Sequence, residues 1–497
     1  GKKLLDGAQK GGAQVMVLSA TIGSSMQELS FLAETLGLVA SESQPTNPIS
    51  DIKSLSTAVR RLGPEVGLEA ISIQMRLSGA FIARTLSMVG VEYTTVNASM
   101  SSSDAQLYEA CSALWKDLFA VDVWSKPRTA AVFHSANLRF FKALAMTIRL
   151  PCVLEQAIKE LNAGNQVILS LLSTDESSIS RSQAEKEDDE DDDDDNGVQA
   201  DEETSRLQNG ALRDNILQVC AFARKQCDTA SETDALSRIE ARAKTLNVPA
   251  VGGIDVIKHK LSASLGPSKV VELTGRKKML QCEVGNDLAD LSNWSIVNRA
   301  ESMLDGKQRF QEGKARVAIL SAAASTGCSL HDVNGARRVV ITMELPYTAS
   351  AFVQTAGRSH RAGQKSAPKF VLVSIPELAS EARFTGAISQ RLAQLGAITA
   401  GDRRSGAEKA DFGDAKMLVG SIANRASETV ASRNHIRLGS SPTSLKLMNR
   451  CLALPPTKGN DIMQQLKSET KKLYESEKAK GKVSSRIWDV VVDGERI

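Results

Sequence analysis

The chain contains little of what secreted or membrane-spanning proteins need. Its seven cysteines are scattered without a C-x-x-C pair, and there are only five histidines, which disfavours both a disulfide framework and a zinc site. No stretch approaches the ~20 consecutive apolar residues of a membrane span. The opening GKKLLDGAQK has neither an initiator methionine nor a signal-peptide core. We therefore expect no metal site, no membrane partner, a reducing compartment, and a cut inside a longer protein.

Two motifs of ATP-hydrolysing proteins are also missing. The Gly-Lys pairs at Gly306, Gly313 and Gly481 lack both the leading glycine and the following hydroxyl residue of a G-x-x-x-x-G-K-[ST] loop. Without that loop the β- and γ-phosphates have no cradle. No D-E-x-H-type segment is present to hold magnesium. These absences predict that the chain alone neither binds ATP tightly nor hydrolyses it.

Charge is distributed unevenly along the chain. The net charge is +3, but residues 185–203 contain thirteen acids and one lysine, a local charge of −12, so the remainder carries +3 − (−12) = +15. A basic body suits a polyanionic partner, although many soluble proteins are equally basic. Nine consecutive acids at 187–195 cannot bury apolar area, so we expect a disordered insertion over about 176–210. Such a tract is either a passive solvated loop or a histone-binding segment.

Apolar runs alternate with helical patterns over most of the chain. The strand-like runs include VEYTTVN, NQVILSLLST, ARVAILSA, RRVVITMEL and PKFVLVSI. SSSDAQLYEACSALWKDLF begins with residues that cap helices, and Pro151 is predicted to open another helix. Strands separated by helices predict an α/β fold, with a parallel sheet covered by helices on both faces. The sequence beyond Gly401 is polar and predicts helices.

The most informative motif is QTAGRSHRAGQ, residues 354–364, which follows an apolar strand. It places Gln354, Arg358 and Arg361 at Q-x-x-G-R-x-x-R spacing. Arginine keeps its charge and holds phosphate oxygens with a planar fork of donors. The alternative is an arginine-rich helix face that forms surface ion pairs.

Three further segments end strands with small or hydroxyl residues. They are LSAT at 18–21, VILSLLST at 167–174 and SAAASTGCSL at 321–330. Such residues bring backbone amides and hydroxyls close to phosphate, and Gly327 permits a close backbone approach. LSAT alone is nearly uninformative, and SAAASTGCSL is also compatible with an ordinary strand-to-helix turn.

In this order, the four segments resemble superfamily-two helicases and translocases. These proteins pair two RecA-like lobes, with ATP between the lobes and nucleic acid across the top. The resemblance implies that Arg361 is the main arginine finger on the γ-phosphate, with Arg358 supporting it and Gln354 positioning the nucleotide. It also implies nucleotide-side roles for Gly327, Ser329, Ser19 and Thr21, and nucleic-acid contacts for Ser321, Thr326, Ser173 and Thr174. Ser329 stands where many relatives carry an aspartate, which weakens the ribose contact.

A narrower resemblance runs along almost the whole chain. ELTGRK at 272–277, MELPYTASAFVQTAGRSHRAGQKSAP, ELASEARFTGAISQRLAQLGAITAGDRR and LMNRCLALPP are similar to the strawberry notch family. This resemblance implies residues 1–125 as the end of a first RecA-like lobe, 126–400 as the second lobe, and 401–497 as a mainly helical C-terminal region. It further implies a large nuclear protein acting with transcription or chromatin proteins, in which full-length relatives use ATP and Mg²⁺.

Three functions remain open at this point. The first is the C-terminal half of an ATP-dependent helicase or translocase that acts on DNA or RNA. The second is a non-catalytic scaffold that binds nucleic acid or protein. The third is a Swi/Snf-type remodelling ATPase, which SAAASTGCSL disfavours because it lacks the glycine-rich leucine pattern of those enzymes. Tyr347 either stacks on a base or packs within the second lobe.

Overall fold

The computed structural model describes the central and C-terminal parts of the chain. The described residues are 51, 53–55, 64–77, 79, 90–125, 127–171, 212–249, 251–276, 278–283, 285–288, 291–321, 328–343, 356–378, 381, 417–439, 442–480, 491–492 and 495–496. Residues 1–50 and the acidic run lie outside these ranges. The disorder expected for that run therefore stays a prediction. No helix within these ranges is both long and apolar enough to cross a membrane.

The chain divides into two compact units. One comprises residues 1–88, 386–416 and 469–497, in which helix α4 (Pro64–Leu77) and the short strands β9 (Val491–Val492) and β10 (Glu495–Arg496) are described. The other comprises residues 89–385 and 417–468. The second unit contains the sheet and the described candidate site residues.

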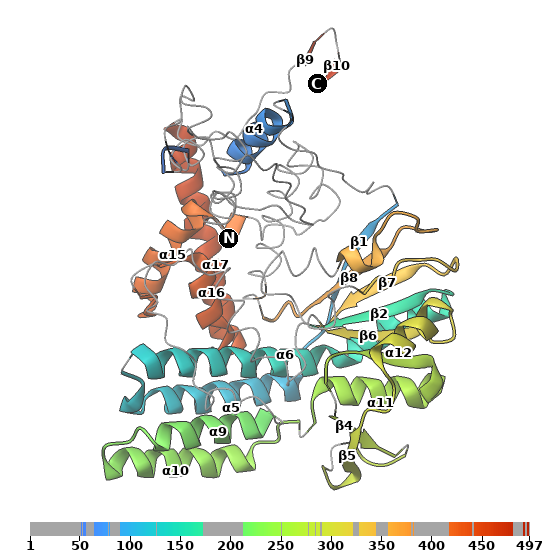
Figure 1. The fold of residues 1–497 in the computed structure, drawn as a ribbon. Helices are drawn as coiled ribbons and strands as arrows, with labels where there is room; N and C mark the ends of the chain where they lie inside the picture. Colours follow the sequence, from blue (N-terminus) through green and yellow to red (C-terminus); the bar gives the residue numbers. More distant parts are fainter. Residues whose placement is uncertain are drawn as a thin grey trace, which may run out of the picture. The chain divides into compact units, whose positions relative to one another are not determined.

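A six-stranded sheet forms the centre of the second unit (Figure 1). Its order is β1-β8-β7-β2-β6-β3, and every neighbouring pair is parallel. The strands are β1 (Glu92–Asn97), β2 (Gln166–Leu171), β3 (Val270–Leu273), β6 (Val317–Ser321), β7 (Arg338–Thr342) and β8 (Lys369–Ser374). The parallel sheet confirms the α/β prediction, and the five strand-like runs all form strands.

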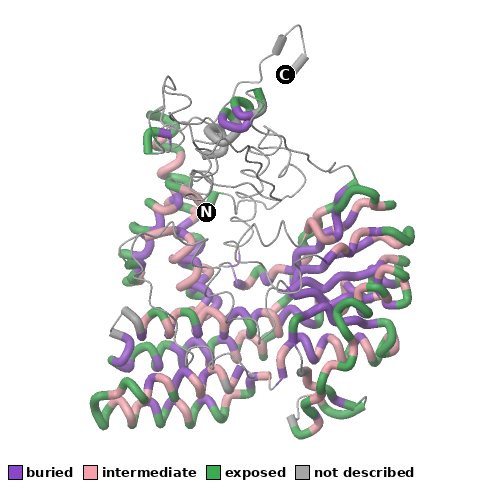
Figure 2. The backbone as a smooth tube through the Cα atoms, in the orientation of Figure 1, coloured by how far each residue is buried: buried purple, intermediate pink, exposed green. Residues whose placement is uncertain are grey.

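Helices cover both faces of this sheet, so its central strands are buried along their length (Figure 2). Val167 and Leu169 belong to a large core shared with α6, α9 and α11. On the opposite face, α12 packs closely on β3: a Cβ on Gly306 would lie 3.1 Å from Leu273 Cδ2. Strands buried on both faces explain the nearly continuous apolar runs in the sequence. The helices named here are α6 (Pro127–Asn162), α9 (Leu212–Arg224), α11 (Gly253–Leu265) and α12 (Met303–Gln311).

Helix α5 (Ser102–Phe119) begins where its capping residues predict. The Ser101 side chain accepts from the Asp104 backbone N–H, and the Asp104 carboxylate accepts from the Ser101 N–H at 3.1 Å. The helix start predicted at Pro151 is wrong, because Pro151 lies inside α6. The buried face of α6 runs from Phe140 through Leu144 to Val153 without a break. Burial of this face outweighs the local helix-breaking preference of proline.

The helical C-terminal region is confirmed over its described part. It contains α15 (Ser421–Arg433), α16 (Ser444–Leu452) and α17 (Pro456–Ala479). The Tyr108 hydroxyl of α5 donates to the Leu452 carbonyl at 2.5 Å, so α16 is joined to the helices that cover the sheet. This unit also contains helix α10 (Ala230–Thr245) and short 3-10 turns at Asp122–Ser125, Pro267–Lys269 and Leu291–Asn293.

One feature of this unit was not expected from the sequence. A hairpin of β4 (Lys278–Cys282) and β5 (Trp294–Asn298) follows β3, packed around Trp294, Cys282 and Val251. The compact unit begins at Val89, and β1 forms one edge of its sheet by pairing with β8 over its whole length. The expected lobe boundaries stay predictions.

Candidate functional site

The two arginines of the strongest motif lie at the end of a short helix, residues 356–359. Arg361 Nε donates to the Gly357 carbonyl at 3.0 Å, and its backbone N–H donates to Gln364 Oε1 at 3.1 Å. The Arg358 carbonyl accepts from the Leu330 N–H at 2.8 Å. Segments 328–330 and 356–361, separate in sequence, are therefore in contact.

Asp332 fixes the loop that follows the arginines. It is fully buried, and its carboxylate accepts from the Gly335 N–H at 2.7 Å and the Ser366 hydroxyl at 2.5 Å. Its carbonyl accepts from the Lys365 N–H at 2.9 Å. A buried carboxylate whose oxygens accept from several donors is held in one position. Sequence reasoning missed Asp332, although the H-D-x-N-G pattern around it is typical of a tight polar turn.

The site carries positive charge that the described residues do not neutralise. Arg358 Nε and His331 Nδ1 are buried without hydrogen-bond partners. Burial, followed by the like charge of Arg361, lowers the pKa of Arg358. Burial and the charges of Arg361 and Arg338 also lower the pKa of His331. Burial raises the pKa of the neighbouring Cys328 thiol even though the arginines oppose this.

Within the described ranges, neither Arg358 nor Arg361 has a carboxylate partner. Two adjacent guanidinium groups without counter-ions repel each other, and an anion between them relieves the repulsion. The unsatisfied donors therefore fit a phosphate group, and more particularly a polyphosphate.

This group lies at the amino edge of the sheet. The Leu330 carbonyl accepts from Arg338 Nε at 3.0 Å, and Arg338 is the first residue of β7, paired with Gln166 at the start of β2. Arg338 is fully buried and lies over the Phe310 ring at 5.1 Å. Burial lowers its pKa to about 10. Gln166 and Arg338 hold the loops around the arginines in place through these contacts. The apolar strand sequences that contain the two residues do not predict this role.

Ser321 lies at the opposite, carboxyl edge, where it ends β6 and pairs with Leu171, the last residue of β2. At ~3.3 Å per residue, the two edges of these five- to six-residue strands are about 17–20 Å apart. Ser321 Oγ is buried and has no hydrogen-bond partner. The structure therefore separates the expected nucleotide residues from the expected nucleic-acid residue.

The remaining predicted positions are only partly described. The Ser329 carbonyl accepts from Gln311 Nε2 at 3.1 Å, and Ser329 directly precedes Leu330, whose N–H donates to the Arg358 carbonyl. Seven other residues, and Tyr347, lie outside the described residues and keep their roles as predictions. The seven are Ser19, Thr21, Ser173, Thr174, Thr326, Gly327 and Gln354.

A parallel α/β lobe with such an arginine motif defines the class of helicase-like P-loop NTPases. Comparison with known proteins agrees: residues 257–435 match the family described as the C-terminal domain on Strawberry notch homologue, and residues 7–110 match P-loop containing NTP hydrolase pore-1. The chain is thus similar to strawberry notch proteins in both of these regions.

Named relatives extend the similarity over most of the chain. Protein strawberry notch homolog 1 of Rattus norvegicus is 28% identical over 79% of this chain and 37% of its own length. Protein FORGETTER 1 of Arabidopsis thaliana is 25% identical over 79% of this chain and 40% of its own length. The human strawberry notch homolog 1 is 42% identical over 28% of this chain and 10% of its own length. The chain thus spans a little over a third of the first two relatives.

Proposed function

We propose that this chain supplies the second RecA-like lobe of an ATP-dependent translocase or helicase that acts on DNA or RNA. The observation that carries the proposal is the pair Arg358 and Arg361, held side by side without a carboxylate partner among the described residues. Negative charge develops on the γ-phosphate of bound ATP during phosphoryl transfer. The two guanidinium groups would stabilise this charge.

Each residue of the pair has a distinct part in this proposal. Arg361 is exposed and its Nε is oriented by the Gly357 carbonyl, so its free terminal nitrogens suit the main finger. Arg358 is partly buried with an unsatisfied Nε and suits a supporting role. His331, whose pKa is lowered by burial and by neighbouring arginines, stays neutral near physiological pH and donates or accepts a hydrogen bond. Gln354 positions the nucleotide.

The same proposal divides the chain into lobes and a C-terminal region at residues 125 and 400. It also includes the use of Mg²⁺, a nuclear location, and partners in transcription or chromatin. These rest on the family resemblance. We propose that the phosphate loop is supplied outside this chain, because no such motif occurs in the sequence. The chain alone is then expected to show no nucleic-acid-stimulated ATP hydrolysis.

Nucleic-acid binding by the chain tests the proposal directly. Labelled oligo-dT and oligo-U of about 20 nucleotides are titrated by fluorescence anisotropy. We expect affinity for at least one of them to fall steeply between about 50 and 200 mM salt, because each neutralised phosphate releases a counter-ion. Absence of binding to both at low salt contradicts the translocase proposal and favours a protein scaffold.

A further inference from the structure

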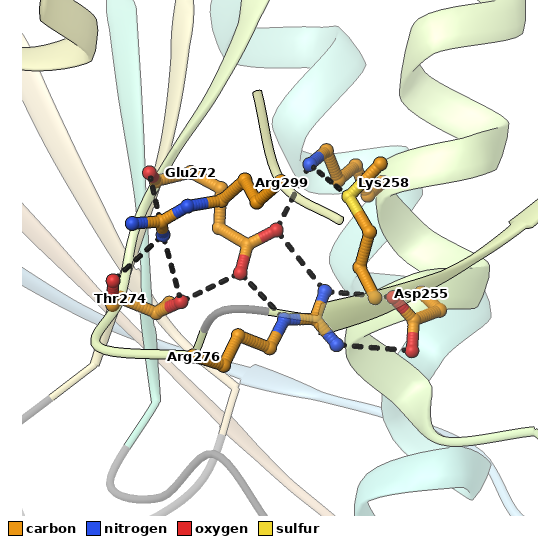
Figure 3. Close-up of polar contacts among 7 residues, drawn as sticks. Asp255, Lys258, Glu272, Thr274, Arg276 and Arg299 are labelled. Carbon is orange, nitrogen blue, oxygen red and sulfur yellow. Dashed lines mark hydrogen bonds and ion pairs between the residues drawn. The ribbon is translucent and has the colours of Figure 1, made fainter. Parts of the chain in front are cut away.

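A second charged cluster surrounds Glu272, on the edge strand β3 (Figure 3). Its carboxylate accepts from Arg276 Nε at 2.6 Å, from Lys258 Nζ at 2.9 Å and from the Thr274 hydroxyl at 2.6 Å. Arg276 also donates to both oxygens of Asp255, at 2.7 and 3.0 Å. All the groups in this cluster except Lys258 are buried. Arg276 is thus neutralised by two carboxylates.

Arg299, directly after the β4–β5 hairpin, has a different environment. Its Nη1 donates to the Thr274 carbonyl at 2.6 Å and lies 3.3 Å from the Thr274 hydroxyl, and both of these acceptors are neutral. Figure 3 shows Arg299 and Arg276 approaching Glu272 and Thr274 from different sides. Arg276 and Lys258 occupy the Glu272 carboxylate, and no carboxylate in the described ranges pairs with Arg299. Arg299 therefore keeps its full charge in a fixed position.

This position is at the carboxyl edge of the sheet. Leu273 pairs with Leu320 in parallel register, so Thr274 lies level with Ser321 on the neighbouring strand, about 4.8 Å away. The buried Ser321 hydroxyl is inaccessible to a strand, whereas Arg299 is only partly buried. Arg299 is thus a charged group that a strand at this edge can reach.

We infer that Arg299 is a further nucleic-acid contact, which binds a backbone phosphate of a strand lying along the carboxyl edge. The inference rests on the proposed nucleic-acid function. It adds Arg299, which directly follows the β4–β5 hairpin, to the residues that would contact the strand. Arg276 is a positioning residue in this arrangement, since it holds the turn whose Thr274 carbonyl orients Arg299. A guanidinium fixed by carbonyl groups keeps donors free for phosphate oxygens.

The test compares Arg299→Gln with Arg316→Gln in the anisotropy titration. Arg316 is a matched control because it is also partly buried and donates only to carbonyls, those of Leu161 and Asn165, but at the amino edge. We expect R299Q to weaken binding by about 3–10-fold and to reduce the salt slope by about 1. R316Q should change neither quantity, and R299K, which keeps the charge, should retain the slope.

Wild-type affinity and slope in a folded R299Q variant overturn this inference while leaving the proposed function intact. Absence of binding by the wild-type chain overturns the proposed function itself. If circular dichroism shows that R299Q does not fold, hydrogen exchange on the wild-type chain replaces it. Bound oligonucleotide should then protect backbone amides in residues 294–299, and unchanged exchange there contradicts the inference.

Discussion

At the scale of single residues, Glu272 shows how the fold keeps a buried charge. Burial alone would raise the pKa of Glu272, but its hydrogen bond and ion pair with Arg276, helped by Lys258, outweigh burial and hold the pKa at about 2. The folded state therefore binds this proton at a lower pH than the unfolded chain, in which the carboxyl has its ordinary pKa of 4.5. The resulting stabilisation is fully present above pH 4.5 and is lost as pH falls from 4.5 to 2.

Glu272→Gln tests this account. We expect the free energy of unfolding at neutral pH to fall by about 3 kcal/mol, as for other buried pairs that lose one partner. The difference between wild type and variant, measured by urea denaturation, should shrink as pH falls from 4.5 towards 2. Burial, together with the charge of Glu272, raises the pKa of Asp255, so the substitution also changes the titration of Asp255 and the pH dependence belongs to this coupled pair. A difference independent of pH across this window contradicts the prediction.

The sequence predicts the arginine pair, and the structure shows why it identified only part of the surrounding site. Arg358 and Arg361 belong to one short motif, and its other members lie eight residues or fewer away along the chain. The spacing within the sequence is therefore enough to identify the two arginines. Asp332 and Arg338 act through contacts with segments distant in the chain, such as the Gln166 side chain at 2.5 Å from Arg338. Such contacts depend on strand register, which a single sequence does not specify.

At the scale of elements, a contact between α5 and α16 joins two parts of the unit that contains the sheet. The buried Tyr108 hydroxyl donates to the Leu452 carbonyl at 2.5 Å, at the end of α16. Tyr93 is a natural comparison: its ring stacks on Phe370 at 5.1 Å, and it has no hydroxyl hydrogen bond to a described residue.

Tyr108→Phe should lower the free energy of unfolding by about 1–2 kcal/mol, because the Leu452 carbonyl loses its donor while the ring stays packed. Tyr93→Phe should change this free energy by less than about 0.5 kcal/mol. Thermal or urea unfolding of the two variants measures the contrast. Equal effects of the two substitutions would mean that the hydrogen bond does not stabilise the attachment of α16.

The elements themselves differ in how well the sequence predicts them. The strands of the sheet and the start of α5 follow from apolar runs and from the Ser101–Asp104 cap, which are local signals. The continuation of α6 through Pro151 depends on packing along its whole buried face. The β4–β5 hairpin depends on Trp294 reaching Val251 and on the ionic cluster at Glu272, and neither contact produces a periodic pattern.

At the scale of the whole molecule, the proposal assigns different roles to the two edges of one sheet. Arg358 and Arg361 lie at the amino edge without a described counter-ion, while Ser321, Thr274 and Arg299 lie at the carboxyl edge. A lobe that holds nucleotide at one edge and a strand at the other can link hydrolysis to movement along nucleic acid. The basic charge outside the acidic run agrees with such a partner.

The most direct test of this account is nucleic-acid-stimulated ATP hydrolysis by the complete protein that contains this chain, with Arg361→Ala compared with Arg238→Ala. Arg238 is an exposed arginine of α10 outside both edges. We expect R361A to reduce the stimulated rate by at least about 10³-fold, as for other arginine fingers, while R238A leaves it unchanged. Equal rates in wild type and R361A would contradict the assignment of the arginine pair to the γ-phosphate.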